Sequence, residues 1–331
     1  MAGSREIAVK QSIPQHLRYS FEDFLRQFPD NDACLEHVKE QRWPNGITYC
    51  ETCKADKKHH RVTGRTAYAC ETCGWHIYPL AGTILEKTTT SLRTWFYAMY
   101  LMGSTRCGIS AKQIQRETSV TYKTAWRMFK QIRSLLSEDF QVETAVEMDE
   151  TYFGGRPRFR RSRQAGVKSA GGRPGADDPQ KTPIIGIVER KGRVIAKATR
   201  DVKAETLMGM VSEHILPEST IYTDEFKSYA GIEKLGQGYH HKRVHHSAKV
   251  YVMGDAHTNS VEGFWSLIKR GIGGVYHAVS QEYLQTYLDE YTYRYNRRDM
   301  GNLIFMSILA EVSKQVRGRR ADQASPQIES A

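Results

Sequence analysis

Four cysteines in two close pairs constrain the fold of this chain more than any other feature of its sequence. Cys50, Cys53, Cys70 and Cys73 form the pattern C-x2-C-x16-C-x2-C. Two such pairs bring four thiolates to one tetrahedral site, which is the ligand set of a structural Zn²⁺ ion. The protein supplies all four ligands, so no coordination position is left for a substrate. The segment between the pairs suits a short β-hairpin, and we predict a zinc ribbon over residues 46–85.

Charge and hydropathy favour nucleic acid as the partner. The 331 residues carry a formal net charge of +11 and a pI near 9.3, an excess that is typical of proteins that bind polyanions. An acidic membrane surface is the second candidate. No apolar run reaches the length of a membrane span, and the N-terminal segment has no apolar signal-peptide core, so we predict neither a span nor secretion. Cysteines that are sparse and paired for a metal are typical of a reducing cytosol.

The rest of the chain divides into regions of different hydrophobic period. Residues 1–45 contain the amphipathic segment FEDFLRQF, before which Ser20 and Asp23 are spaced as a capping box. Helical periodicity dominates after the cysteines, and strand-like segments and a hairpin follow further on. The other predicted regions are a helix-turn-helix domain (88–138), a mixed catalytic domain (143–314) with a basic loop (156–180), and a polar tail (315–331).

The helical region has the spacing of a DNA-binding helix-turn-helix. Two helices over residues 110–135 are joined by a short turn near 118–121. Lys123, Arg127 and Lys130 recur at i, i+4 and i+7 on the second helix, which in such motifs enters the major groove. Helix pairs also occur in proteins that never contact DNA. The positive charge of the chain and the neighbouring zinc module favour the DNA-binding interpretation.

Three carboxylates stand where acidic residues are unusual. Asp149 lies among apolar neighbours in the strand-like VEMDETY, and Asp224 closes the short strand IYTDE. Glu262 belongs to an amphipathic helix that starts near residue 257, with Asn259 one turn before it. Carboxylates brought together from strands and a helix would bind two Mg²⁺ or Mn²⁺ ions for phosphoryl transfer. The alternative is that acidic residues such as Glu147, Asp149 and Glu150 merely edge a sheet.

The segments that carry these residues resemble a known family. They read VEMDETYFGGR, IYTDEFKSY, HTNSVEGFWSLIKRGIGGVYHAVS and YLDEYTYRYNRR, with RWPNG before the first cysteine pair. Together, over about residues 20–300, they are similar to bacterial insertion-sequence transposases with a DDE catalytic domain, in the group with an N-terminal zinc ribbon and a helix-turn-helix. The resemblance implies a multidomain α+β protein whose catalytic domain has an α/β, ribonuclease-H-like fold, as in retroviral integrases.

The resemblance also implies the catalytic residues. Asp149, Asp224 and a helix residue would bind two Mg²⁺ or Mn²⁺ ions, and the zinc ion would be structural. The third position varies between Glu, Asn and His in the wider group. We expect Glu262 there, because it is anionic and Lys269 lies two turns on, where the family places a basic residue; Asn259 is the alternative.

The implied activity is DNA transposition. A cytoplasmic, nucleoid-associated bacterial enzyme would bind terminal inverted repeats, cleave DNA strands and join the freed 3′-OH to target DNA, as a homodimer or larger assembly. Lys269 and Arg270 would hold DNA phosphates, and Arg297 is a further candidate contact. Two alternatives are a catalytically inert, transposon-derived DNA-binding protein and a related metal-dependent nuclease.

Overall fold

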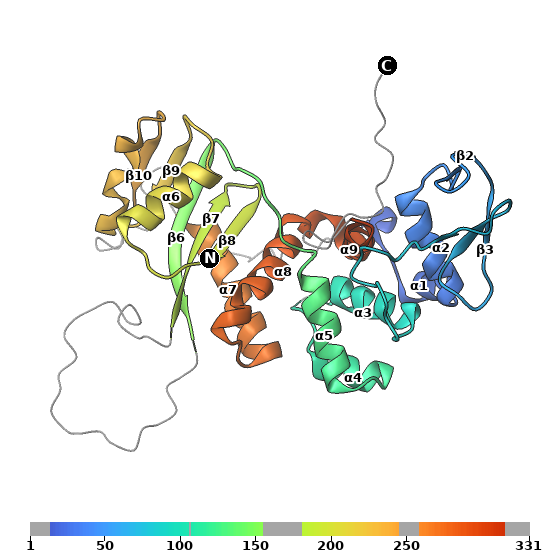
Figure 1. Ribbon diagram of the computed structural model, residues 1–331. Helices are drawn as coiled ribbons and strands as arrows, with labels where there is room; N and C mark the ends of the chain where they lie inside the picture. Colours follow the sequence, from blue (N-terminus) through green and yellow to red (C-terminus); the bar gives the residue numbers. More distant parts are fainter. Residues whose placement is uncertain (1–13, 106, 155–180, 245–257, 315–331) are drawn as a thin grey trace. The chain divides into compact units, whose positions relative to one another are not determined.

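The computed structural model describes residues 14–105, 107–154, 181–244 and 258–314, which belong to two compact units (Figure 1). The first unit holds the chain up to Ser104 and again from Arg297 onward, and the second spans Thr105–Asn296. The predicted basic loop (156–180) and polar tail (315–331) lie outside the described residues. No helix in the described part of the chain is long and apolar enough to cross a membrane.

The first unit combines helices with two small sheets. Its short strands form the antiparallel pair β1–β2 and the antiparallel sheet β3–β4–β5. The predicted capping box is confirmed, because the side chains of Ser20 and Asp23 cap the start of the first α-helix reciprocally. The elements are η1 (Gln15–Leu17), α1 (Phe21–Gln27), α2 (Asn31–Arg42), β1 (Tyr49–Cys50), β2 (Ala55–Asp56), β3 (His59–Arg61), β4 (Tyr68–Cys70), β5 (His76–Ile77), α3 (Leu92–Ser104), η6 (Arg298–Leu303) and α9 (Ile304–Val312).

An aromatic core joins the N-terminal helices of this unit to α9, the last helix among the described residues. Phe24 of α1, Phe96 of α3 and Phe305 of α9 are buried, and the ring of Phe28 lies within 6.0 Å of the rings of Phe96 and Phe305. Gly103 permits the close approach of α3 and α9, since a Cβ there would lie 2.7 Å from the backbone nitrogen of Phe305. The predicted domains placed α3 with the helix-turn-helix and α9 with the catalytic domain. In the structure both belong to the first unit, because their apolar faces share this core.

The second unit contains a mixed five-stranded sheet with helices on both faces. The predicted strands, hairpin and helices over residues 143–296 are present, and the hairpin between β7 and β8 turns at Lys191. The elements are α4 (Ala111–Thr118), α5 (Tyr122–Arg133), β6 (Ala145–Phe153), β7 (Thr182–Glu189), β8 (Val194–Ala198), α6 (Ala204–His214), β9 (Thr220–Thr223), η2 (Lys227–Leu235), β10 (His240–Arg243), α7 (Asn259–Gly271), η4 (Ile272–Tyr276), η5 (Gln281–Tyr283) and α8 (Leu284–Asn296).

The order of the strands identifies the fold of this unit. The sheet runs β10-β9-β6-β7-β8, in which β6, β7 and β8 are antiparallel neighbours and β9 and β10 continue the sheet in parallel from β6. Helix α6 and η2 cover one face through an apolar cluster that includes Met148 and Tyr229. Helices α7 and α8 cover the other through a cluster that includes Ile184 and Trp265 (Figure 1). This is a ribonuclease-H-like fold, as predicted.

The predicted helix-turn-helix corresponds to α4 and α5, and it packs within the second unit. Ser119 ends α4 in the left-handed conformation, with φ at 57°, and the Thr121 side chain caps α5. The inner face of α5 ends in Arg133, which donates from Nε to Glu290 of α8 at 2.7 Å with both side chains almost fully buried. Arg294 binds the same carboxylate at 3.1 Å. A buried charge of this kind requires its partners, so the pairing holds α5 on α8.

Candidate metal-binding and catalytic sites

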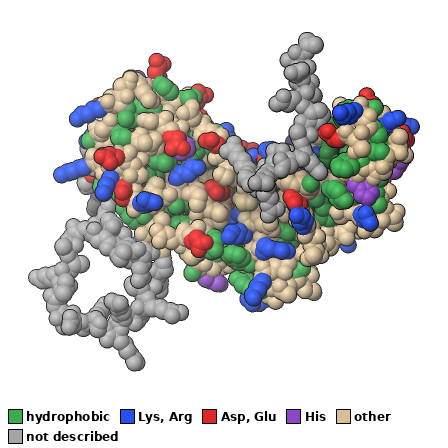
Figure 2. Space-filling model, viewed as in Figure 1, with side chains coloured by type: hydrophobic (Ala, Val, Ile, Leu, Met, Phe, Trp, Pro, Cys, Tyr) green, Lys and Arg blue, Asp and Glu red, His purple; other side chains and the backbone are tan. Residues whose placement is uncertain are grey.

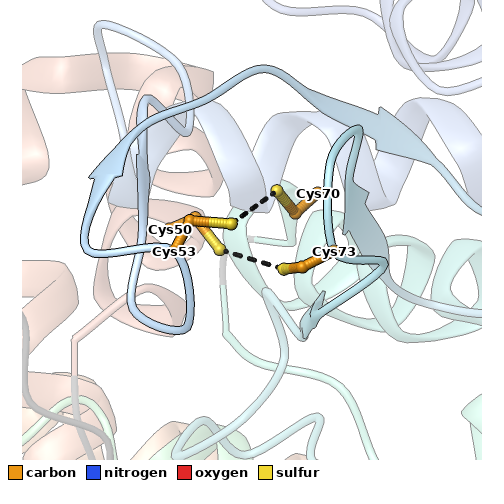
Figure 3. Close-up of side chains that lie close together, drawn as sticks. All are labelled: Cys50, Cys53, Cys70 and Cys73. Atoms are coloured by element: carbon orange, nitrogen blue, oxygen red, sulfur yellow. Dashed lines mark hydrogen bonds between the residues drawn. The ribbon is translucent and has the colours of Figure 1, made fainter.

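The four cysteines of the first unit converge on one point (Figure 3). Cys50 ends β1 and Cys53 lies in the turn that follows it, and in the same way Cys70 ends β4 and Cys73 lies in the turn after it. The Sγ atoms of Cys50 and Cys73 are 3.5 Å apart and those of Cys53 and Cys70 are 4.0 Å apart. Zn–S bonds of about 2.3 Å in a tetrahedron require S···S separations of about 3.8 Å. The cluster therefore has the ligands and the spacing of a structural zinc site.

Local backbone geometry prepares this cluster for a metal. Gly74 has a φ of 70°, a conformation that glycine adopts without strain, and this lets the chain reverse directly after Cys73. Backbone N–H groups of Cys73 and Thr72 lower the pKa of the Cys70 thiol to about 6. Hydrogen bonding to the neighbouring thiols, first of all Cys73, raises the pKa of Cys53 to about 12. The lowered pKa favours the thiolate form of Cys70 at neutral pH. A bound cation would displace the protons from the other thiols.

The second unit brings three carboxylates together at one edge of the sheet. Glu147 of β6 pairs with Tyr222 of β9 in parallel register, so Asp149 and Asp224 lie level with one another two residues further along. Oxygen atoms of Asp149, Glu150 and Asp224 all lie within 4.8 Å of one another. Carboxylate oxygens at this spacing are hard ligands that suit Mg²⁺ or Mn²⁺.

Burial and like charge perturb the central carboxylate of this acidic cluster. Loss of solvent raises the pKa of Asp149 to about 7, and the charges of Glu150 and Asp224 add to that rise. The indole nitrogen of Trp265 donates to Asp149 at 3.0 Å and partly opposes the shift. The indole fits there because Gly186, the partner of Asp149 on β7, has no side chain. The acidic cluster is therefore a site where a cation would replace a proton.

The helix that contributes Trp265 also carries both candidates for the third catalytic position. Asn259 is the first residue of α7 and Glu262 lies one turn later, and both side chains are exposed. Thr258 donates to the Glu262 carboxylate at 3.4 Å. The Glu262 carboxylate does not belong to the group of acidic oxygens within 4.8 Å that includes Asp149. Among the described residues, the carboxylate that forms this group with Asp149 and Asp224 is that of Glu150.

Sequence reasoning did not assign Glu150 to the site. Alternation along a strand places neighbouring side chains on opposite faces, so Asp149 and Glu150 are not expected to meet. The carboxylate of Glu150 accepts a hydrogen bond at 2.7 Å from the buried Tyr229 hydroxyl. The pair Asp-Glu occurs at 149–150 and 224–225 but also at 289–290, outside the acidic cluster, so this repeat does not single out Glu150.

Comparisons with known proteins agree with this arrangement. A transposase zinc-ribbon domain model matches residues 29–76, and an ISXO2-like transposase domain model matches residues 141–296. A protein of the transposable element ISH50 of Halobacterium salinarum is 30% identical over 283 residues, which cover 82% of this chain and 92% of that protein. The chain belongs to the ISXO2-like transposase family.

Further relatives of this transposase match in part. A transposase-like protein of Haemophilus influenzae is 27% identical over 124 residues, which cover 38% of this chain and 96% of that protein. Two solved structures of the Mos1 system were also found. The pre-cleavage transpososome has a TM-score of 0.27 and 13% identity, covering 62% of this chain and 75% of that chain. The strand transfer complex has a TM-score of 0.26 and 14% identity, covering 62% and 74%.

The three basic side chains that the sequence predicted as DNA contacts on α5 are exposed in this transposase. Lys123, Arg127 and Lys130 face solvent, whereas Met128 and Phe129 on the other side are buried. The Lys130 ammonium lies 4.9 Å from the ring centre of Tyr283. This contact orients the Lys130 side chain and leaves it exposed to solvent. Figure 2 shows basic side chains over the region of α4 and α5.

The other predicted DNA contacts lie on different elements. Lys269 and Arg270 are exposed in the last turn of α7, in the same unit as the acidic cluster. Arg297 is half-buried and begins the second stretch of the first unit. Asn296, its neighbour in the chain, takes part in packing. Its side chain accepts from the backbone nitrogen of Val194 at 2.7 Å and donates to the carbonyl of Val194 at 3.1 Å.

Proposed function

We propose that this family member is an active DNA transposase, which binds the terminal inverted repeats of its element and catalyses strand cleavage and 3′-OH strand transfer. The observation that carries the proposal is the acidic cluster of Asp149 and Glu150 on β6 and Asp224 directly after the neighbouring β9 of a ribonuclease-H-like sheet. Burial, and after it the charges of Glu150 and Asp224, raises the pKa of Asp149 to about 7. Carboxylates held together in this way destabilise the fold when no ligand is bound. Such clusters are therefore typical of sites that bind cations.

The residues fit two divalent cations. Asp149 and Asp224 would bind them, with Glu262 at the third position and Asn259 as its alternative on the same turn of α7. When bound, Mg²⁺ or Mn²⁺ would supply activation of water or a 3′-hydroxyl and stabilisation of the leaving oxygen. The Trp265 indole would hold Asp149 in one orientation, and Lys269 and Arg270 would neutralise phosphates of the bound strand.

DNA recognition would fall to the zinc ribbon and to the helix pair. The cysteine cluster would hold one structural Zn²⁺ ion, and α5 would present Lys123, Arg127 and Lys130 to the DNA. The buried Arg133–Glu290 pair supports this role, because it fixes α5 to the unit that carries the acidic cluster. Cutting two ends of one element in concert would require a dimer or a larger assembly on DNA.

Cleavage of a DNA duplex that carries the element's own ends, in Mg²⁺, tests the proposal. We expect Asp149→Ala and Asp224→Ala each to reduce strand cleavage by about 100- to 1,000-fold, in line with the loss of transition-state charge stabilisation. Asp139→Ala, at an exposed position of the same unit, is the control and should cleave like the wild type. Full activity of Asp224→Ala would end the catalytic interpretation and leave a DNA-binding protein.

The same assay identifies the third position. Under the proposal, Glu262→Ala abolishes cleavage and Asn259→Ala lowers it only moderately. An inactive Asn259→Ala beside an active Glu262→Ala would move the role to Asn259. Glu150→Gln adds a third outcome, since loss of cleavage there alone would assign the role to the carboxylate that already lies within 4.8 Å of Asp149 and Asp224.

A further inference from the structure

A buried carboxylate outside the acidic cluster holds the beginning of α7. Glu147 lies in β6, two residues before Asp149, and its side chain is fully buried. The backbone N–H groups of Ser260 and Val261 donate to its Oε2 atom at 2.8 and 3.1 Å. The Ser260 hydroxyl donates to Oε1 at 3.1 Å. Three donors from the first turn of one helix therefore converge on one carboxylate of a distant strand.

This contact replaces the local cap that a helix usually has. Thr258 occupies the N-cap position of α7, but its side chain accepts no hydrogen bond from the helix backbone. The first N–H groups of a helix have no partner within it, and together they form a partly positive end that a carboxylate stabilises. Glu147 supplies that carboxylate across more than a hundred residues of sequence.

An arginine holds the other side of the same carboxylate. Arg190, directly after β7, donates from Nε to Oε1 of Glu147 at 3.0 Å. Its guanidinium lies over the ring of Tyr222, 3.8 Å from the ring centre. Tyr222 belongs to β9 and stands two residues before Asp224. Glu147, Arg190 and the first turn of α7, which we call the α7 clamp, thus connect β6, β9 and α7.

These three elements are the ones that carry the proposed metal ligands. Asp149 is on β6, Asp224 follows β9, and Asn259 and Glu262 are in the first turn and a half of α7. Glu147 is not part of the described group of acidic oxygens that includes Asp149. Its oxygens already accept hydrogen bonds from four donors, so its chemistry is that of an anchor for the helix.

We propose that Glu147 is a positioning residue, which through the α7 clamp sets the place of the third metal ligand relative to Asp149 and Asp224. This role rests on the proposed metal-dependent function, although the clamp itself does not. A residue that orients a ligand without binding the metal changes metal affinity by about 10- to 100-fold when it is replaced. The role therefore predicts a defect in metal binding that exceeds any defect in DNA binding.

The test compares Glu147→Gln with the wild-type protein. Glutamine keeps the shape of the side chain but removes its charge and turns an NH2 group toward the N–H donors of α7 or toward Arg190. Glu143→Gln is the matched control, because Glu143 is exposed just before the same strand. Ser260→Ala is the milder variant, since it removes only the hydroxyl contact and leaves both backbone hydrogen bonds in place.

Three measurements separate positioning from general stability. Hydrogen exchange in protein without Mg²⁺ or Mn²⁺ should be at least tenfold faster in Glu147→Gln for a peptide from the first turns of α7, and unchanged for a peptide from α8. Mn²⁺ binding, followed by electron paramagnetic resonance, should weaken by about 10- to 100-fold. The Mg²⁺ concentration at half-maximal cleavage should rise by a similar factor, while DNA binding without metal stays within twofold.

Each outcome decides one part of the inference. If Glu147→Gln exchanges and binds Mn²⁺ like the wild type, the positioning role is wrong. If the variant loses cleavage only in proportion to its folded fraction, with unchanged Mn²⁺ affinity, Glu147 is merely structural. If Glu147→Gln fails to fold, Ser260→Ala provides the test. We expect this variant to lose Mn²⁺ affinity by about two- to fivefold, and an unchanged Mn²⁺ affinity would show that the positioning role is wrong. A wild-type protein that neither binds Mn²⁺ nor cleaves refutes the proposed function, and local exchange still tests the clamp.

Discussion

Replacing Asp149 by asparagine should stabilise the metal-free protein. Burial and the charges of Glu150 and Asp224 raise the pKa of Asp149 from 3.8 to about 7. At about 1.36 kcal/mol per unit, this difference corresponds to about 4 kcal/mol of unfavourable free energy when Asp149 is ionised. Because Asp149 is only half-buried, water screens part of the effect, and we expect asparagine to raise the free energy of unfolding by about 1–3 kcal/mol at pH 8. Asparagine also keeps an oxygen that accepts the Trp265 hydrogen bond.

The pH dependence of this effect has a definite sign. The folded protein binds the Asp149 proton more tightly than the unfolded chain does, so the contribution of Asp149 to stability falls as pH rises from about 4 to about 7. The full cost is present above pH 7 and disappears below pH 4. The advantage of Asp149→Asn should therefore be largest at pH 8 and less than half as large at pH 5.

Urea unfolding followed by far-UV circular dichroism measures this difference. Buffers without Mg²⁺ keep the acidic cluster free of that ion and leave the zinc site untouched. Asp139→Asn is the control, since Asp139 is exposed and should show no gain. A variant that is no more stable than the wild type at pH 8, or that gains equally at pH 5 and pH 8, would refute the electrostatic reasoning. Added Mg²⁺ should then stabilise the wild type more than Asp149→Asn.

Three further outcomes follow from the described contacts. Cys70→Ala should unfold the ribbon at 37 °C and abolish stoichiometric zinc in the purified protein, as measured by atomic absorption. Cys34→Ala is the control and should retain zinc, because Cys34 is a buried cysteine outside the cluster. Gly186→Ala should lower the unfolding midpoint and reduce cleavage at least tenfold, because the added Cβ overlaps the Trp265 ring that holds Asp149; wild-type activity would show that the indole contact is dispensable. Arg127→Ala should weaken binding to the element's ends and reduce the salt dependence of log K by about one unit of slope, as measured by fluorescence anisotropy, and an unchanged slope would place Arg127 away from phosphate.

The sequence alone was sufficient for features that depend on local spacing. The cysteine pairs meet because a C-x2-C turn points both sulfurs the same way, and the helices around Trp95, Trp126 and Phe264 follow from apolar residues at a period near 3.6. The acidic strands were recognisable because Asp149 and Asp224 interrupt apolar runs. Their approach could be expected from the family resemblance, and the parallel register of β6 and β9 accounts for it.

Only the tertiary structure decided how separated elements share a core or a site. Glu150 joins Asp149 and Asp224 although strand alternation separates neighbouring side chains, and Glu147 caps a helix more than a hundred residues away. Helix α9 packs with α3 in the first unit, because Phe305 fits against Gly103. Hydrophobic period shows which face of an element is buried but not which element buries it, since that choice depends on the register of the sheet and on the shapes of the packed side chains.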